Sequence, residues 1–177
     1  MTITVRFATP ADFDRLLELD SLVYKVEWQV TKSFAEEAWS KNPYIYRVLE
    51  YTHEIQGFIA FFPVEKEIFE QLFEGKIDEL SLCHYILPYE KNNSVYLYLA
   101  NIIVDTKHEL SKEFAKVMIK EISKEIQRIR NSGCLVNEVG AIGITEAGNR
   151  VLSKSKLHYI GRLLEEDTNH IYRGSCF

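Results

Sequence analysis

The sequence predicts a single mixed α/β domain spanning residues 1–177, and three observations support this. The chain has 177 residues, which is within the usual size of one domain. Hydrophobic residues make up 46% of it and charged residues 27%, as in folded rather than disordered chains. Strand-like and helix-like patterns alternate along the whole length, with no internal repeat or linker between them.

The first half of the chain contains patterns for three strands and three helices. Ile3, Val5 and Phe7 alternate with polar residues, which predicts a half-buried strand. Thr9-Pro10 then favours the start of a helix over 10–23. The other expected elements are a helix over 33–39, a hairpin of strands 44–50 and 56–64, and a helix over 66–74 that covers the sheet. Residues 76–94 show no clear period and predict an irregular surface segment.

The second half begins with the most strand-like stretch of the sequence. Residues 95–104, VYLYLANIIV, are almost continuously apolar, as expected for a central strand buried on both faces. Apolar residues then recur every four positions from Leu110 to Ile126, which predicts a long amphipathic helix ending near Gly133. The last expected elements are a strand over 135–144, a short helix over 145–155, and strands 159–164 and 170–174 around a polar turn at 166–169.

Charge and cysteine content limit the function classes. The chain has 21 Lys and Arg against 26 Asp and Glu, a net charge of −5, which disfavours nucleic-acid binding. No apolar run approaches the length of a membrane helix, and Arg6 and Asp12 interrupt any signal-peptide core, so we expect no membrane partner and a cytoplasmic protein. Cys83, Cys134 and Cys176 are odd in number and lack CxxC spacing, which predicts buried reduced thiols and no metal.

Three stretches of the chain resemble parts of one known family. They are TVRFATPADFDRLLELD, SVYLYLANIIVDTKHELSKEFAKVMIKEI and ITEAGNRVLSKSKLHYIGRL. The first is similar to the opening strand and helix of the GNAT N-acetyltransferase superfamily. The second resembles its central strand, pyrophosphate loop and long helix, and the third its closing helix and the strand after it. The resemblance covers essentially the whole chain. It implies a mostly antiparallel sheet of six to seven strands, flanked by helices, in which the central strand splays from the next one in a V.

The resemblance also implies acetyl-CoA as co-substrate, bound by two segments. The end of the central strand, Ile102, Ile103 and Val104, would hold the pantetheine through its main chain, because the side chains there are apolar. The start of the long helix would hold the pyrophosphate through free amides and the helix dipole. Its residues are Ser111, Lys112, Glu113, Phe114 and Ala115. Asn149 in the closing helix is a further expected cofactor contact.

The pyrophosphate segment departs from the family pattern Q/R-x-x-G-x-G/A. Ala115 matches its last position, whereas Glu113 stands where the first glycine is expected and brings a side chain and a negative charge. Lys107, His108 and Lys112 lie nearby in the sequence and would compensate for that charge.

Acyl transfer to an amine needs a group that takes the excess proton. The main candidates are Glu138, on the strand over 135–144, and Tyr98, on the central strand. His84 and His158 are weaker candidates, because the sequence does not predict which way their segments face. The alternatives are an exposed strand carboxylate for Glu138 and a core or pocket-lining aromatic for Tyr98. The closing helix lacks the tyrosine that many family members use as an acid, and Tyr159 matches a buried Phe instead, so it is expected in the core. The thiolate would then leave unassisted or through water.

These features predict an acyltransferase that moves acetyl from acetyl-CoA to a primary amine of a small molecule or peptide. The alternative is a GNAT-shaped binding or regulatory module without cofactor chemistry, suggested by Glu113 and the absent tyrosine. An unrelated α/β interaction domain is a third interpretation. The net charge of −5 mildly favours cationic amines. An exposed final strand would allow pairing across a homodimer.

Overall fold

The computed structural model describes residues 2–165 and 169–175, so Cys176 and most of the turn expected at 166–169 lie outside the described residues. A seven-stranded sheet has the order β1-β2-β3-β4-β5-β7-β6, and neighbouring strands are antiparallel except for the parallel pair β4 and β5. The strands are β1 (Ile3–Phe7), β2 (Tyr46–Tyr51), β3 (Glu54–Val64), β4 (Ser94–Val104), β5 (Leu135–Gly143), β6 (His158–Arg162) and β7 (His170–Gly174). The α-helices are α1 (Phe13–Ser21), α2 (Lys32–Lys41), α3 (Lys66–Phe73), α4 (Ser111–Asn131) and α5 (Glu146–Leu152).

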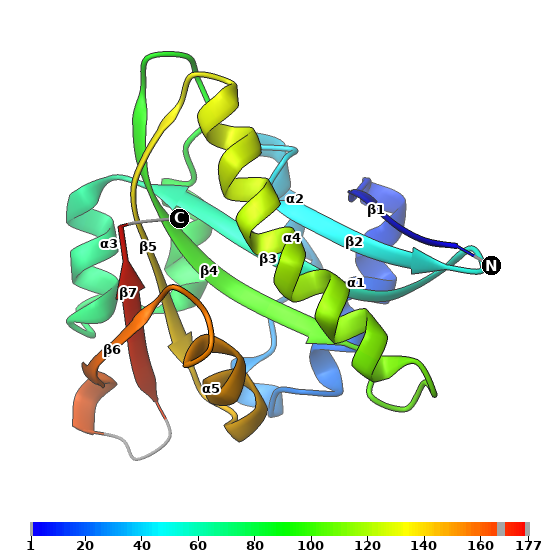
Figure 1. Cartoon of the computed structure of the whole chain (residues 1–177). Helices are drawn as coiled ribbons and strands as arrows, with labels where there is room; N and C mark the ends of the chain where they lie inside the picture. Colours follow the sequence, from blue (N-terminus) through cyan, green and yellow to red (C-terminus); the bar gives the residue numbers. More distant parts are fainter. Residues whose placement is uncertain (1, 166–168, 176–177) are drawn as a thin grey trace.

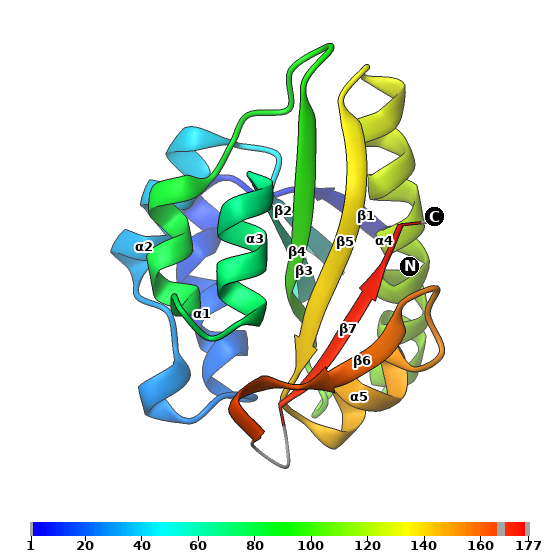
Figure 2. The same cartoon turned by 90° about the vertical axis from the view of Figure 1, so that its left-hand side faces the viewer.

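Helices cover both faces of the sheet, with α1, α2 and α3 on one side and α4 and α5 on the other (Figures 1 and 2). Each side has its own hydrophobic core. The core under α1 to α3 includes Phe13, Phe62 and Tyr98, and the core under α4 includes Leu97 and Phe114. Alternate residues of β4 therefore face opposite cores, as the continuous apolar run predicted.

Two expected local features are confirmed. Phe69, Leu72 and Phe73 of α3 are buried against the sheet, so this helix covers the sheet as expected. Cys83 and Cys134 are buried free thiols. Within the described part of the chain, no helix combines the length and the apolar content needed to cross a membrane.

Two expectations about the fold were wrong. Tyr159 is not in the core: it is 54% exposed, because β6 is the outermost strand at its edge of the sheet. The segment 76–94 is not wholly irregular, since Glu79–Tyr85 forms a 3-10 helix, here called η3. Asp78 caps η3, its Oδ1 accepting a hydrogen bond from the Ser81 amide at 2.8 Å.

The parallel pair β4 and β5 separates partway along its length. The strands pair from Ser94 opposite Leu135 to Tyr98 opposite Gly140, and they then diverge toward their C-terminal ends (Figure 1). Gly140 stands where the pairing ends, and a Cβ there would lie 2.5 Å from the Phe73 ring, so α3 packs directly on the backbone at this point. The predicted fold class, including the V between the central strand and the next, is confirmed.

Candidate active site

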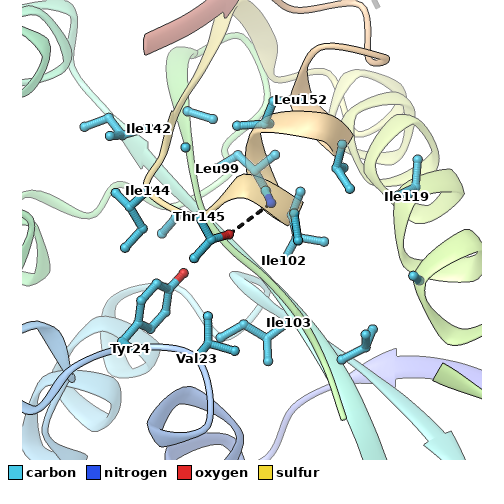
Figure 3. A pocket seen from close by; sticks show the side chains of 18 of the residues that line it. Val23, Tyr24, Leu99, Ile102, Ile103, Ile119, Ile142, Ile144, Thr145 and Leu152 are labelled. Carbon is cyan, nitrogen blue, oxygen red and sulfur yellow. Dashed lines mark hydrogen bonds between the residues drawn. The ribbon is translucent and has the colours of Figure 1, made fainter. Parts of the chain in front are cut away.

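A cavity of about 190 Å³ fills the V between β4 and β5 (Figure 3). Its walls come from both strands, from the starts of α4 and α5, and from the connection that follows α1. The main lining residues are Val23, Tyr24, Leu99, Ile102, Ile103, Val104, Thr106, Ala115, Ile119, Ile142, Ile144, Thr145, Gly148 and Leu152. Most are aliphatic, while Tyr24, Thr106 and Thr145 bring hydroxyl groups. The cavity is therefore a mainly apolar slot next to unpaired strand backbone.

A capping interaction fixes α5 at the end of β5. Thr145 Oγ1 accepts a hydrogen bond from the Gly148 amide at 3.0 Å, the usual arrangement of a threonine N-cap (Figure 3). One turn later, the Asn149 side chain lies so close to Gly143 that a Cβ there would have no room. Asn149 Oδ1 is buried and has no hydrogen-bond partner within the described residues. A buried acceptor without a donor is costly, which makes this atom a candidate ligand contact.

The start of α4 forms another end of the site. The Leu110 amide donates to His108 Nδ1 and the Ser111 amide to the His108 carbonyl, both at 3.0 Å. The next two amides, those of Lys112 and Glu113, have no intrahelical partner because of their place in the first turn. Two amide hydrogen-bond donors therefore remain at the N-terminus of α4, which is the positive end of the helix dipole.

The structure separates the expected cofactor residues into two groups. Ile102, Ile103, Val104 and Ala115 line the cavity, whereas the other expected residues are not among its lining. Phe114 is fully buried and packs in the α4 core beside Tyr51 and His108.

Glu113, which replaces the motif glycine, has a half-exposed side chain. Its Oε1 lies 3.8 Å from Lys116 Nζ on the same helix, so its charge is directed along α4.

Glu138 and Tyr98 are also outside the cavity lining. Glu138 accepts hydrogen bonds from Arg173 Nε at 2.6 Å and Nη2 at 2.8 Å. Arg173 also contacts Glu70 of α3 at 2.8 Å and lies over the Phe69 ring. Glu138 is thus one partner in an ion-pair network between α3, β5 and β7.

Tyr98 leads to a residue that the sequence analysis missed. The Tyr98 side chain is fully buried, and its hydroxyl donates to Glu79 Oε2 at 2.7 Å. Burial, and secondarily the charge of nearby Asp20, raise the pKa of Glu79 to about 7, although the bond from Tyr98 opposes the shift. Burial likewise raises the pKa of Asp20 to about 6. Two carboxyl groups with raised pKa values therefore lie beside β4.

Tyr24 connects this polar group with the cavity. It lines the cavity (Figure 3), and its hydroxyl accepts a hydrogen bond from Asn101 Nδ2 of β4 at 3.3 Å. The nearby Glu79 carboxylate is one of the causes that raise the pKa of Tyr24, after burial. The site thus has an apolar slot between β4 and β5 and a polar, acid-containing wall on the α1 side.

Comparison of the whole structure with solved structures identifies the fold. The loading GNATL domain of CurA from Lyngbya majuscula superposes with a TM-score of 0.71 and 15% identity, over 99% of this chain and 98% of that one. NAA60 of Arabidopsis thaliana, in complex with acetyl-CoA, gives a TM-score of 0.65 and 16% identity over 99% and 100% of the two chains. The chain has the GNAT fold. The GNAT-like decarboxylase GphF, in complex with isobutyryl-CoA, gives a TM-score of 0.68 and 12% identity over 97% of this chain and 98% of that one.

Sequence comparison gives no match: no protein-family model and no curated protein matches this chain. The GNAT fold is therefore recognised through strand order, the V between β4 and β5, and the position of α4.

Proposed function

We propose that this protein is an acyltransferase that moves the acetyl group of acetyl-CoA to a primary amine of a small molecule or peptide. The observation that carries the proposal is the end of β4–β5 pairing at Tyr98 and Gly140, which opens an apolar cavity beside unpaired strand backbone. Solved structures with the same fold contain acetyl-CoA and isobutyryl-CoA, which supports a CoA thioester as the ligand of this cavity.

In this proposal the cofactor lies along β4 and its phosphates reach α4. The main chain of Ile102 to Val104 would bond the pantetheine amides, because only backbone groups are polar there. The amides of Lys112 and Glu113 would hold the pyrophosphate. The Asn149 side chain has a buried acceptor without a partner in the described chain, and it would accept from one of the pantetheine amides.

The proposed chemistry is direct attack by the neutral amine on the thioester carbonyl. A carbon–nitrogen bond forms, the carbon–sulfur bond breaks, and the amine loses one proton while the CoA thiolate takes one from water. We propose that the amine enters past Tyr24 and that Glu79, held by Tyr98, accepts its proton. A carboxyl pKa of about 7 suits a base that operates near neutral pH.

Glu138 is the second candidate for the base. Neither Glu138 nor Glu79 is among the residues that line the cavity, but Glu79 lies near Tyr24, which lines it. Glu138 is instead held by two hydrogen bonds from Arg173 and would have to act through a water molecule. Matched variants separate the two assignments: Glu79→Gln lowers turnover and Glu138→Gln does not if Glu79 is the base, and the reverse result assigns Glu138.

The first experiment is a binding titration with acetyl-CoA followed by thermal unfolding. Ligand at 100 times its dissociation constant stabilises the folded state by about 2.7 kcal/mol, which is easily measured. CoA release is then followed with a panel of polyamines, aminoglycosides and peptides with free N-termini. A reaction without any amine is included to measure hydrolysis of the thioester, because only CoA release that depends on the amine reports acyl transfer.

One observation favours a non-catalytic binding module as the second candidate function. Glu113 adds a negative charge to the first turn of α4, and although its Oε1 is directed toward Lys116, this charge weakens binding of any anion at the helix start. No stabilisation by acetyl-CoA, together with no CoA release from any mixture, would support this module and exclude the acyltransferase.

A further inference from the structure

A second group of reactive side chains lies outside the cavity, where α2 packs on η3. Glu37 belongs to α2, whereas Cys83 and His84 are consecutive residues of η3. One donor atom from each lies within 4.8 Å of the others. His84 Nδ1 is 2.9 Å from Glu37 Oε1 and 3.8 Å from Cys83 Sγ.

The supporting structure holds these elements in place. Asn42, which ends α2, is buried, and its Nδ2 donates to the Leu87 carbonyl just after η3 at 2.8 Å. The Thr31 hydroxyl caps the other end of α2 by accepting from the Phe34 amide at 3.2 Å. The positions of Glu37 and Cys83 are therefore set by two anchored helices and not by a free loop.

The donor arrangement does not fit a nucleophilic triad. In such a triad the imidazole uses one nitrogen for the nucleophile and the other for the carboxylate. Here the thiol and the carboxylate both lie next to the same atom, His84 Nδ1. Three donors that converge on one point are typical of ligands sharing a cation.

We propose that Glu37, Cys83 and His84 form a zinc-binding site that joins α2 to η3. Zn²⁺ takes thiolate at about 2.3 Å and nitrogen or oxygen at about 2.0 to 2.2 Å, so neighbouring ligands of a tetrahedral site lie roughly 3.3 to 3.6 Å apart. The distances of 2.9 and 3.8 Å require only small side-chain shifts to reach this. Ca²⁺ and Mg²⁺ prefer oxygen ligands alone, which excludes them here.

The site has room for a fourth ligand, and one side chain, Lys41, would compete with the cation for Glu37. His84 and Glu37 are exposed on one side, so water would complete the tetrahedron. Lys41 Nζ lies 3.5 Å from the same Glu37 oxygen and has to move away when the cation binds. Removing this ammonium group is therefore expected to strengthen metal binding.

The position of the site gives it a role in the fold. Cys83 and His84 share η3 with Glu79, the acid beside β4. Zinc bound between α2 and η3 would hold the element that carries Glu79, so it would act as a structural metal near the polar wall of the cavity. CxxC spacing could not reveal such a site, because Glu37 is 46 positions away from Cys83 in the printed sequence.

The test uses the full chain purified without metal and titrated with Co²⁺, whose thiolate complexes absorb in the near ultraviolet. We expect one Co²⁺ per chain, displaced by Zn²⁺. His84→Ala and Cys83→Ser should weaken binding roughly 10- to 100-fold or more, since loss even of second-shell partners costs that much. Lys41→Met should tighten binding.

Cys134→Ser is the matched control, because Cys134 is the other buried free thiol of the described chain and lies outside the cluster. It should leave the Co²⁺ spectrum unchanged. His84 is exposed, so His84→Ala is expected to fold normally even if Cys83→Ser does not. No thiolate band in the wild type at millimolar Co²⁺, or an equal affinity in His84→Ala, would overturn the proposal.

Discussion

Replacing Glu79 by Gln is expected to stabilise the protein at alkaline pH. The pKa of Glu79 is raised from its ordinary value of 4.5 to about 7, mainly by burial. The unfolded chain therefore ionises this group near pH 4.5, while the folded chain keeps it protonated until about pH 7. Stability contributed by the neutral form is present at acid pH and is lost as the pH rises through this window.

The size of this stability change follows from the difference between the pKa of Glu79 in the unfolded chain and in the folded chain. Each pH unit is worth about 1.36 kcal/mol, so ionised Glu79 costs the folded state about 3 kcal/mol at pH 8. Glutamine has nearly the same shape, cannot ionise, and still accepts the hydrogen bond from Tyr98. The difference in free energy of unfolding between Glu79→Gln and the wild type should therefore shift in favour of the variant by about 2 to 3 kcal/mol between pH 5 and pH 8.

Urea unfolding of both proteins at pH 5 and pH 8 measures this difference. Glu138→Gln is the matched control, because Glu138 is also partly buried but is paired with Arg173. Its loss should lower stability, with no gain at pH 8. If Glu79→Gln and the wild type had the same pH dependence of stability, the Glu79 carboxyl would not be held in its neutral form, and our assignment of its environment would be refuted.

Four further predictions concern the site and the sheet. Glu113→Gly should lower the dissociation constant for CoA by removing bulk and charge at the α4 start, and an unchanged or weaker constant would mean that the phosphates bind elsewhere. With an acceptor found, Glu79→Gln should lower turnover by roughly 10²- to 10⁴-fold and remove the rise of activity through pH 7, while CoA affinity stays nearly constant. Tyr98→Phe should not abolish turnover, since Glu79 keeps its carboxyl; a collapse with normal folding and CoA binding would make Tyr98 the essential group. Gly140→Ala should destabilise the fold by about 1 to 3 kcal/mol in urea unfolding, because its Cβ would meet Phe73, and a neutral result would show that α3 moves freely there.

The sequence predicted the elements that have a strong period or a continuous apolar run. The strand expected over 95–104 is β4, Ser94–Val104, and the helix expected after Leu110 is α4, Ser111–Asn131. Both are long and bury large faces, so hydrophobic pattern alone determines them. Boundaries were less accurate where turns decide them: β2 begins at Tyr46, two residues later than expected.

The polar side of the site could not be predicted in the same way. Glu79, Cys83 and His84 lie in a segment without periodicity, and their partners come from α2 and β4. Long-range packing, which no local pattern encodes, brings them together. The Asp78-x-x-Ser81 capping pattern was the available local signal for η3, and it would have indicated an ordered turn there.

The interrupted pairing of β4 has a consequence for hydrogen exchange. Beyond Tyr98, every second amide of β4 faces the V instead of a neighbouring strand, although β4 lies in the middle of the sheet. The centre of a sheet normally contains the slowest-exchanging amides of a protein. Here the segment 99–104 should combine slow amides, bonded to β3, with fast ones open to the cavity. A ligand that forms hydrogen bonds with the unpaired amides would slow only the fast set. Amide exchange would therefore show, residue by residue along β4, which part of the cavity is occupied.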